Sequence, residues 1–490
     1  MQEVHFVPLD AARLRGLFLP DRAERFTTLA AEARELTRGR VVWNVNATAQ
    51  GGGVAEMLHT LLGYVRGVGV DTRWLVLTGS PEFFIVTKRL HNLLHGDPGD
   101  GGPMGAAEHA VVADALAPDL DEMVGRVSAG DVVVLHDPQT AGMVDRLRAA
   151  GAVVVWRCHV GRDDTNELTR RAWSFLRPLV QHADAFVFSR DGYAPEWCGT
   201  AGLRVISPSI DPFSAKNCAL TDEEVRDSLR RSGLVTDGGD GSAVGFLRGD
   251  GSRGSVRRHD GLVVDGPPIP AGARLVVQVS RWDRLKDMAG VQQGFVDTLG
   301  TLPDDVHLVL VGPDVSGVAD DPEGAAVLAE CRALWSRLGA RERRRVHLVC
   351  LPMDDEEENA HLVNALQRRS TVMVQKSLVE GFGLTVTEAM WKGRPLLASA
   401  VGGIQDQVTD GQDGLLLRDP TDLAGFGAAL TTLLNDFALA SRLGRAAHHR
   451  VHEEFLGDKH LGAYVELLRW LSSWSGRLGS ATAAGSPAAR

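Results

Sequence analysis

The chain has 490 residues, of which 44% are hydrophobic and 23% are charged, and its formal net charge is −11. This composition is typical of a globular protein, and the length exceeds what one hydrophobic core usually holds, so we expect two large domains. The acidic balance argues against nucleic acid as a partner, although a local basic pocket for one phosphorylated ligand is compatible with it.

The sequence also gives no indication of a membrane helix, a secretory signal, a metal site or a disulfide framework. The apolar runs are all shorter than the roughly 20 residues that a membrane helix needs. The N-terminal stretch MQEVHFVPLDAARLRG has acids and a proline where a secretory signal has basic and apolar regions, which predicts a cytoplasmic protein. The five cysteines are scattered and never spaced as CxxC, so the pattern predicts no zinc site and no disulfides.

From residue 41, the first half of the chain alternates short β-rich runs with helical patterns. The β-rich runs are VVWNVNA, TRWLVLTG, DVVVLHD, GAVVVWRCH and DAFVFSR, and VAEMLHTLLGYVRG is typical of the helical patterns. Such alternation predicts a parallel sheet with crossover helices. We place this domain at residues 1–212 and expect a helix at about 458–475 to pack back on it.

A second series of β-rich runs follows from residue 273. It begins at ARLVVQVS, continues through VHLVLVG, RVHLVC and TVMVQ, and ends with RPLLAS and GLLL. The series predicts a second doubly wound domain at 213–457, so the expected fold class is α/β with two Rossmann-like domains. Residues 235–271 are rich in Gly, Asp, Ser and Pro and are expected to form a flexible insertion, and the small, polar tail 476–490 is expected to be disordered.

The first candidate site is a run of glycines in NATAQGGGVAEML, between a predicted strand and a predicted helix. Gly52 and Gly53 permit close backbone approach, and the N–H groups of the helix can face a phosphate or a sugar hydroxyl. A tight turn that needs glycine for steric reasons alone is the alternative. Because the run is not GxGxxG and no acid is placed for an adenosine ribose, a dehydrogenase is disfavoured.

Two cations form the second candidate site. The run VSRWDRLKD places Arg281 and Lys286 just beyond a predicted strand of the second domain, where open α/β sheets bind ligands. Arginine supplies a planar fork and lysine a point charge, and the pair suits a diphosphate. A solvated basic turn is the alternative.

Two glutamates in VEGFGLTVTE form the third candidate site, with seven residues between them. Glu388 lies on a predicted helix and can accept two hydroxyl hydrogen bonds, as a ribose diol offers, whereas Glu380 lies in the preceding loop and can address sugar hydroxyls. Gly383 allows backbone contact with a ligand. In the alternative interpretation, Glu388 is an ordinary solvated helix acid and Glu380 is a favourable charge near a helix N-terminus.

Taken together, RWDRLK, EGFGLTVTEAMWKGRPLLAS and VGGIQDQVTDGQDGLLL resemble the nucleotide-sugar domain of the retaining GT-B glycosyltransferases of family 4. The glutamate pair is the signature of that family, and the resemblance covers the C-terminal half of the chain. It implies a donor site with these roles: Arg281 and Lys286 on the diphosphate, Glu388 on the ribose, and Glu380 with the backbone of Phe382, Gly383 and Leu384 around the sugar and phosphate.

The N-terminal half carries a narrower resemblance. VVWNVNATAQGGGVAEML, VLHDPQTAGM, VVWRCHVGRDD and VISPSIDPFSAKN are similar to stretches of the trehalose glycosyltransferring synthases and the trehalose phosphorylases. The resemblance implies that His159, Gly52 and Gly53 lie at the donor, and that the acceptor is contacted by Glu56, Asp137, Gln139 and Arg157. On the residues alone, His159 can also be a satisfied core histidine, and Asp137 before Pro138 can simply shape a turn.

The resemblance implies a reaction: glucose passes from a nucleoside diphosphate glucose to glucose, giving trehalose with an α,α-1,1 linkage and the nucleoside diphosphate, in a reversible step. The family pattern offers no pair of glycosidase-type carboxyls, so we expect same-face attack through an oxocarbenium-like state. Arg281, Lys286, His159 and Glu380 are the residues expected at the chemistry. No tightly bound cofactor and no protein metal site are expected, any Mg²⁺ would come with the nucleotide, and the family suggests a homodimer.

Three other functions stay open on the sequence. A trehalose phosphorylase can use the same cations for inorganic phosphate, although a ribose contact at Glu388 argues against it. A related transferase can act on modified or amino sugars in secondary metabolism. A regulatory protein can bind a sugar nucleotide without turnover, although the joint presence of the candidate site residues disfavours it.

Overall fold

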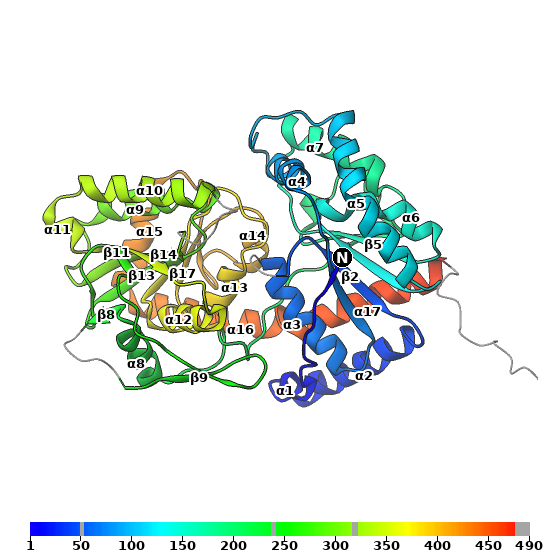
Figure 1. The fold of residues 1–490 in the computed structure, drawn as a ribbon. Coiled ribbons are helices and arrows are strands. Elements are labelled where there is room, and N and C mark those ends of the chain that lie inside the picture. Colours follow the sequence, from blue (N-terminus) through cyan, green and yellow to red (C-terminus); the bar gives the residue numbers. More distant parts are fainter. Residues whose placement is uncertain (50–52, 237–241, 316–321, 476–490) are drawn as a thin grey trace, which may run out of the picture. The chain divides into compact units, whose positions relative to one another are not determined.

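The computed structural model describes residues 1–49, 53–236, 242–315 and 322–475 (Figure 1). It divides the chain into two compact units, Met1–Ser209 with Gly457–Arg490, and Ile210–Leu456. Each unit contains its own sheet, and each is described by itself. The tail 476–490, for which disorder is expected, lies outside the described residues.

The N-terminal unit is built on a seven-stranded sheet with the strand order β1-β3-β2-β4-β5-β6-β7. All neighbouring strands are parallel except β1, which pairs antiparallel with β3. The apolar runs form these strands because a parallel sheet covered on both faces buries every side chain. The strands are β1 (Gln2–Glu3), β2 (Val42–Asn46), β3 (Thr72–Val76), β4 (Val132–His136), β5 (Val153–Cys158), β6 (Ala185–Phe188) and β7 (Leu203–Val205).

Helices cover this sheet, and the last described helix belongs to the same unit. Leu467 and Leu471 of α17 (Gly457–Ser475) pack in one hydrophobic cluster with Val134 and Val155 of the sheet. The chain therefore returns to its N-terminal unit after leaving it at residue 209. The other helices are α1 (Ala11–Arg15), α2 (Pro20–Leu36), α3 (Gly53–Gly67), α4 (Pro81–Leu94), α5 (Ala106–Arg126), α6 (Val144–Ala149) and α7 (Glu167–Val180).

The C-terminal unit repeats the design with the strand order β11-β15-β14-β13-β16-β17-β18, in which only β11 pairs antiparallel with its neighbour. The strands are β11 (Val263–Asp265), β13 (Arg274–Val279), β14 (Val306–Pro313), β15 (Val346–Leu351), β16 (Val372–Gln375), β17 (Leu396–Ser399) and β18 (Leu415–Leu417). The helices are α8 (Asp222–Ser232), α9 (Met288–Thr298), α10 (Pro322–Arg337), α11 (Ala340–Arg343), α12 (Glu356–Arg369), α13 (Leu384–Trp391), α14 (Ile404–Gln407), α15 (Leu423–Asn435) and α16 (Phe437–Glu454). The predicted α/β class with two doubly wound sheets is confirmed.

Within the described ranges, no single helix is long and apolar enough to cross a membrane, whereas Leu423–Asn435 and Phe437–Ser473 pass that test only as a pair bent by 98°.

The segment 235–271, for which a flexible insertion is expected, contains short strands in its described part. Its described part contains β8 (Val235–Thr236), β9 (Gly245–Leu247), β10 (Arg253–Ser255) and β12 (Ile269–Pro270), and it supplies β11 to the main sheet. Phe246 and Val256 are buried. These strands are two or three residues long, which is too short for an alternating apolar pattern to stand out against the surrounding glycines.

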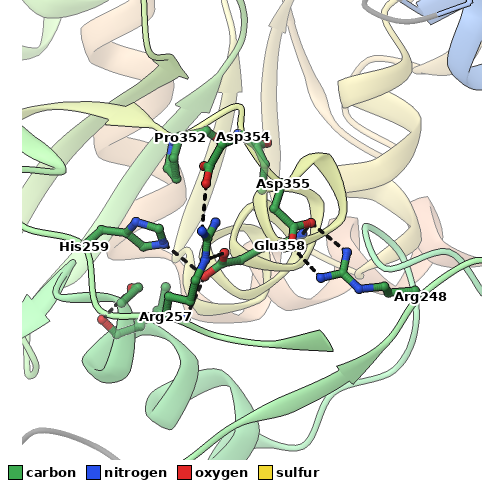
Figure 2. Close-up of polar contacts among 10 residues, drawn as sticks. Arg248, Arg257, His259, Pro352, Asp354, Asp355 and Glu358 are labelled. Atoms are coloured by element: carbon green, nitrogen blue, oxygen red, sulfur yellow. Dashed lines mark hydrogen bonds and ion pairs between the residues drawn. The ribbon is translucent and has the colours of Figure 1, made fainter. Parts of the chain in front are cut away.

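Charged side chains fix this segment to the N-terminal end of α12 (Figure 2). The Arg248 guanidinium donates to Asp355 at 2.8 Å, and Arg257 donates to Asp354 at 2.7 Å and to Glu358 at 2.5 Å. Glu358 is fully buried and also contacts the His259 ring at 3.0 Å. The hydrogen bonds from Arg248 hold the pKa of the Asp355 carboxyl well below its usual range.

Replacing Arg257 by alanine is expected to loosen the hairpin of β9 and β10, because the buried Glu358 carboxylate loses its principal partner. Leaving a buried acceptor short of a partner costs about 1 to 3 kcal/mol. Hydrogen–deuterium exchange at residues 244–256 should therefore become faster, while exchange in β13 stays unchanged. Arg253→Ala is the matched control, since Arg253 is an exposed arginine of the same hairpin. Equal exchange in both variants would contradict the role given to Arg257.

Candidate functional site

The candidate donor residues of the C-terminal unit follow two neighbouring strands, β13 and β16, at their carboxyl ends. The Lys286 ammonium donates to both carboxylate oxygens of Glu380 at 2.7 Å. The hydroxyl of Ser377 donates to the same carboxylate at 3.1 Å. Two residues that are 94 positions apart in the sequence thus form one ion pair at the edge where open α/β sheets bind ligands.

The turn that contains Lys286 is held by side-chain caps. Asp283 accepts from the backbone N–H of Leu285 at 2.8 Å, and Gln278 donates to the Lys286 carbonyl oxygen at 2.7 Å. Arg281, the other predicted cation, is more than half exposed and lies 3.3 Å from the Asp283 carboxylate. The structure thus brings Lys286, but not Arg281, onto Glu380.

A buried lysine beside this turn was missed by the sequence analysis. Lys376 directly follows β16, is fully buried and forms an ion pair with Asp287. Asp287 has a left-handed backbone with φ of 50° and caps α9 through the N–H of Gly290. A lysine immediately after a buried strand is the signal that could have revealed it. Its contact with Asp287 stabilises the backbone conformation directly after Lys286.

The start of α13 needs a glycine. Gly383 has φ of 86°, and a Cβ atom there would lie 3.1 Å from Cγ of Glu380. Phe382 is buried, and its ring lies 6.0 Å from that of Phe455, whereas Leu384 is half-buried at the first position of the helix. The glycine therefore allows the helix to begin directly beside the Lys286 and Glu380 pair.

Glu388, the second signature acid, is not a solvated helix residue. Its carboxylate is buried, accepts from the Gln367 amide at 3.3 Å and lies 3.3 Å from the Lys216 ammonium. Burial lowers the pKa of neighbouring Lys392 to about 7, and the negative charge of Glu388 opposes that shift. Glu388 thus compensates buried positive charge, and a ribose diol would have to share the carboxylate with Lys216 and Gln367.

In the N-terminal unit, Asp137 and His159 follow the neighbouring strands β4 and β5. The Asp137 carboxylate accepts from the His159 backbone N–H at 2.7 Å, and Asp137 adopts a left-handed φ of 65°. Burial raises the pKa of Asp137 to about 7, while the hydrogen bond from His159 and the charge of Arg157 oppose the rise. The carboxyl can therefore either donate or accept a hydrogen bond near neutral pH.

The side chain of His159 belongs to a hydrogen-bonded chain that the sequence analysis missed. Its Nε2 lies 3.1 Å from Nδ1 of His136, and Nε2 of His136 lies 3.1 Å from Oδ1 of Asn44. Burial and the charge of Arg157 lower the pKa values of both histidines well below the usual range, so both rings are neutral at neutral pH. The available signal was Asn44 within the apolar run of β2 and His136 at the end of the apolar run of β4.

Arg157, which is expected to contact the acceptor, lies in the interior of the N-terminal unit. It is fully buried, and its guanidinium donates to the Tyr464 hydroxyl at 2.5 Å and to the Ile206 carbonyl oxygen at 3.2 Å. The bond to Tyr464 ties β5 to α17, and the bond to Ile206 ties β5 to the residue that follows β7. As a strand residue, Arg157 points to the face opposite that of its neighbours in sequence, which the sequence analysis did not consider.

The remaining predicted contacts lie at helix starts in the same unit. Gln139 is half-buried in the 3₁₀ helix Pro138–Met143 that follows Asp137, and Glu56 is exposed in the first turn of α3. Gly53 is the first residue of α3, whereas Gly52 lies outside the described residues. None of these positions contradicts a ligand contact.

Comparison with known proteins yields two family matches. Residues 44–195 match the family described as trehalose synthase, N-terminal domain, and residues 265–450 match glycosyl transferases group 1. A trehalose synthase from Thermococcus litoralis is 32% identical over 450 residues, which are 91% of this chain and 94% of that protein. A trehalose phosphorylase from Pleurotus pulmonarius is 27% identical over 432 residues, but this chain spans only 54% of it.

Solved structures resemble the chain over most of its length. The α,α-trehalose 6-phosphate synthase from Burkholderia multivorans superposes with a TM-score of 0.67 at 15% identity, covering 91% of this chain and 99% of that one. At such low identity the likeness shows the fold alone, which is the GT-B fold of glycosyltransferases, built on two Rossmann-like domains.

Proposed function

We propose that this chain, which belongs to the trehalose synthase family of GT-B glycosyltransferases, transfers glucose from a nucleoside diphosphate glucose to glucose. The products are trehalose and the nucleoside diphosphate. The observation that carries this proposal is the ion pair of Lys286 and Glu380 beside the glycine-started helix α13. It provides a fixed cation at the carboxyl edge of a doubly wound sheet, where a diphosphate is bound.

On this proposal, the cations assist departure of the nucleotide. The bond between the anomeric carbon and the diphosphate oxygen breaks, and the Lys286 ammonium, with the exposed Arg281 guanidinium, stabilises the negative charge on that oxygen. Glu380 holds the ammonium in place through two hydrogen bonds, so little reorganisation is needed when charge develops. Any Mg²⁺ arrives with the nucleotide as part of the donor.

The acceptor reacts on the face from which the nucleotide leaves. Its anomeric hydroxyl forms the new bond to the donor carbon and passes its proton to the departing diphosphate oxygen, which keeps the donor configuration. His159 contacts the donor sugar in this proposal, and Asp137 with Gln139 contacts the acceptor. The side chain of Arg157 is left out of the acceptor site, because it is buried between β5 and α17.

A trehalose phosphorylase is the second candidate, and one observation favours it. Glu388 is already engaged by Lys216 and Gln367, which is compatible with a site that never binds a ribose. In that reaction inorganic phosphate takes the place of the diphosphate beside Lys286. Action on modified or amino sugars and a cytoplasmic location are further proposals, as is a homodimer, which the family suggests.

The deciding experiment supplies both reactions to the purified protein. Glucose is incubated with ADP-, UDP- or GDP-glucose and Mg²⁺, and NMR follows the sugar product while nucleoside diphosphate release is measured. We expect an α,α-1,1 disaccharide with at least one nucleotide, and glucose-free samples measure hydrolysis. Failure of every nucleotide, together with glucose 1-phosphate formed from trehalose and phosphate, would establish the phosphorylase instead.

A further inference from the structure

Three polar side chains on three adjacent strands of the N-terminal unit form a continuous hydrogen-bonded chain. Asn44 lies in β2, His136 ends β4, and His159 follows β5. The rings of His136 and His159 are stacked with an interplanar angle of 10° and centroids 5.4 Å apart. Asn44 and His136 are buried, whereas His159 at the end of the chain is partly exposed.

The direction of the hydrogen bonds is set at the buried end. Asn44 Nδ2 donates to Oγ1 of Thr72 at 3.3 Å, and the Thr72 hydroxyl donates its own hydrogen to the Val42 carbonyl oxygen at 2.9 Å. The Thr72 oxygen is therefore an acceptor for the Asn44 amide, which leaves the Asn44 carbonyl oxygen facing His136. A ring nitrogen that faces a carbonyl oxygen must carry hydrogen, so His136 is protonated at Nε2.

The protonation state of His159 follows from that of His136. A neutral imidazole has one N–H, so Nδ1 of His136 is an acceptor. The hydrogen between the two rings must therefore belong to Nε2 of His159, which leaves Nδ1 of His159 with a lone pair. Among the residues that the structure describes, none forms a hydrogen bond with that Nδ1.

Burial and nearby positive charge keep the His159 ring neutral. Burial is the largest cause that lowers the pKa of His159, followed by the charge of Arg157 and by electrostatic repulsion that protonated His136 and His460 would add. The Asp137 carboxylate contacts the backbone N–H of His159 and not its ring. An imidazolium, which has no lone pair to offer, is thus disfavoured at this position.

We propose that Asn44 and His136 are positioning residues that hold His159 in its Nε2–H tautomer, so that Nδ1 accepts a hydrogen bond from a hydroxyl of the bound sugar. The proposal rests on the proposed function, since it takes His159 to lie beside the donor sugar. It makes the site selective for a sugar that presents an O–H donor there, because an analogue with fluorine in place of that hydroxyl would leave Nδ1 without a partner.

The test measures the tautomer directly. The full chain is labelled with ¹⁵N-histidine, and two-bond ¹H–¹⁵N correlations distinguish Nδ1–H from Nε2–H rings, with the His159 signals identified by their loss in His159→Gln. We expect His159 to be in the Nε2–H form in the wild type and in a mixture of tautomers in Asn44→Leu and His136→Phe. A Nδ1–H ring or an imidazolium in the wild type, or signals unchanged in both variants, would overturn the proposal.

A second stacked histidine pair provides the matched control. His307 and His347 of the C-terminal unit lie 2.9 Å apart between Nδ1 and Nε2, with ring centroids 5.2 Å apart. His307→Phe should leave the His159 signals unchanged. This control separates loss of the hydrogen-bonded chain of Asn44, His136 and His159, which we call the relay, from a general effect of removing a buried histidine. A changed His159 signal in this variant would count against the relay as the cause.

Steady-state kinetics of the same variants test whether the tautomer of His159 affects the reaction. Asn44→Leu is expected to lower kcat/KM for the donor by about 10-fold, the usual effect of one neutral hydrogen bond. A variant with the altered tautomer and unchanged kcat/KM would overturn the positioning role. If the wild type makes no trehalose but His159 has the stated tautomer, the proposed function fails while the relay stands.

Discussion

Lys286→Ala is expected to lower kcat of the glucosyl transfer by about 10²- to 10³-fold, the loss that follows removal of one preorganised donor to developing charge. Two hydrogen bonds of 2.7 Å to Glu380 fix the position of the ammonium. The negative charge on the departing oxygen is greater in the transition state than in the bound donor, so the loss should appear in kcat and not only in KM. Steady-state kinetics with the active nucleotide sugar measure both constants.

The matched control for Lys286 is its neighbour Arg284. Arg284 belongs to the same 3₁₀ turn, Arg284–Lys286, and is exposed. Arg284→Ala removes an equal charge two residues away and should change kcat by less than about 3-fold, because exposed charges are screened by solvent. Similar losses of kcat in both variants would mean that Lys286 acts only through the total positive charge of the turn.

A double variant separates charge stabilisation from folding. Lys286→Ala alone removes the ammonium that pairs with the largely buried Glu380 carboxylate, which is expected to lower the thermal midpoint. Lys286→Ala combined with Glu380→Gln also removes the negative charge of that carboxylate and should recover much of the midpoint. The rate should stay low in the double variant, and a recovered rate would show that Lys286 acts through stability.

The sheets could be predicted from the sequence because their central strands are apolar on both faces. Runs such as VVVLH and RLVVQV are five or six residues long and are buried throughout or nearly so. The short strands β8 to β12 could not be predicted, since two or three residues show no periodicity. Their position depends on Arg248 and Arg257 reaching acids about a hundred residues away.

Residues of the candidate site could be predicted from the sequence only where they belong to a recognisable motif. The glutamates and Lys286 were found in this way, but the contact between Lys286 and Glu380 depends on the pairing of β13 with β16, which spacing does not reveal. Asn44 and His136 were missed because one polar residue in an apolar run is commonly a satisfied core group. The full burial of Arg157 was not predicted, because the direction of a strand side chain alternates with each residue.

Glu388→Gln should weaken binding of the nucleoside diphosphate by about 10- to 100-fold, the range that corresponds to one charge-assisted hydrogen-bonded contact of about 1.5 to 3 kcal/mol. The substitution keeps the shape of the side chain and removes the charge that a ribose diol would hydrogen-bond. Inorganic diphosphate lacks a ribose, so its affinity should change little. Calorimetric titration of both ligands measures the difference, and Glu356→Gln, which changes an exposed acid of α12, is the control.

The same variant should also change how stability depends on pH. Because the folded-state pKa of Lys392 is about 7 and its ordinary value is 10.5, the unfolded chain binds more protons between these values, and stability rises with pH across that window. Glu388→Gln removes the negative charge that opposes this shift, so the pKa of Lys392 falls further and the window extends below pH 7. The loss of thermal midpoint relative to wild type should therefore be larger at pH 6 than at pH 9. Equal losses at both pH values, with unchanged nucleoside diphosphate affinity, would show that Glu388 neither compensates Lys392 nor contacts the ribose, and would leave the phosphorylase as the better account of the site.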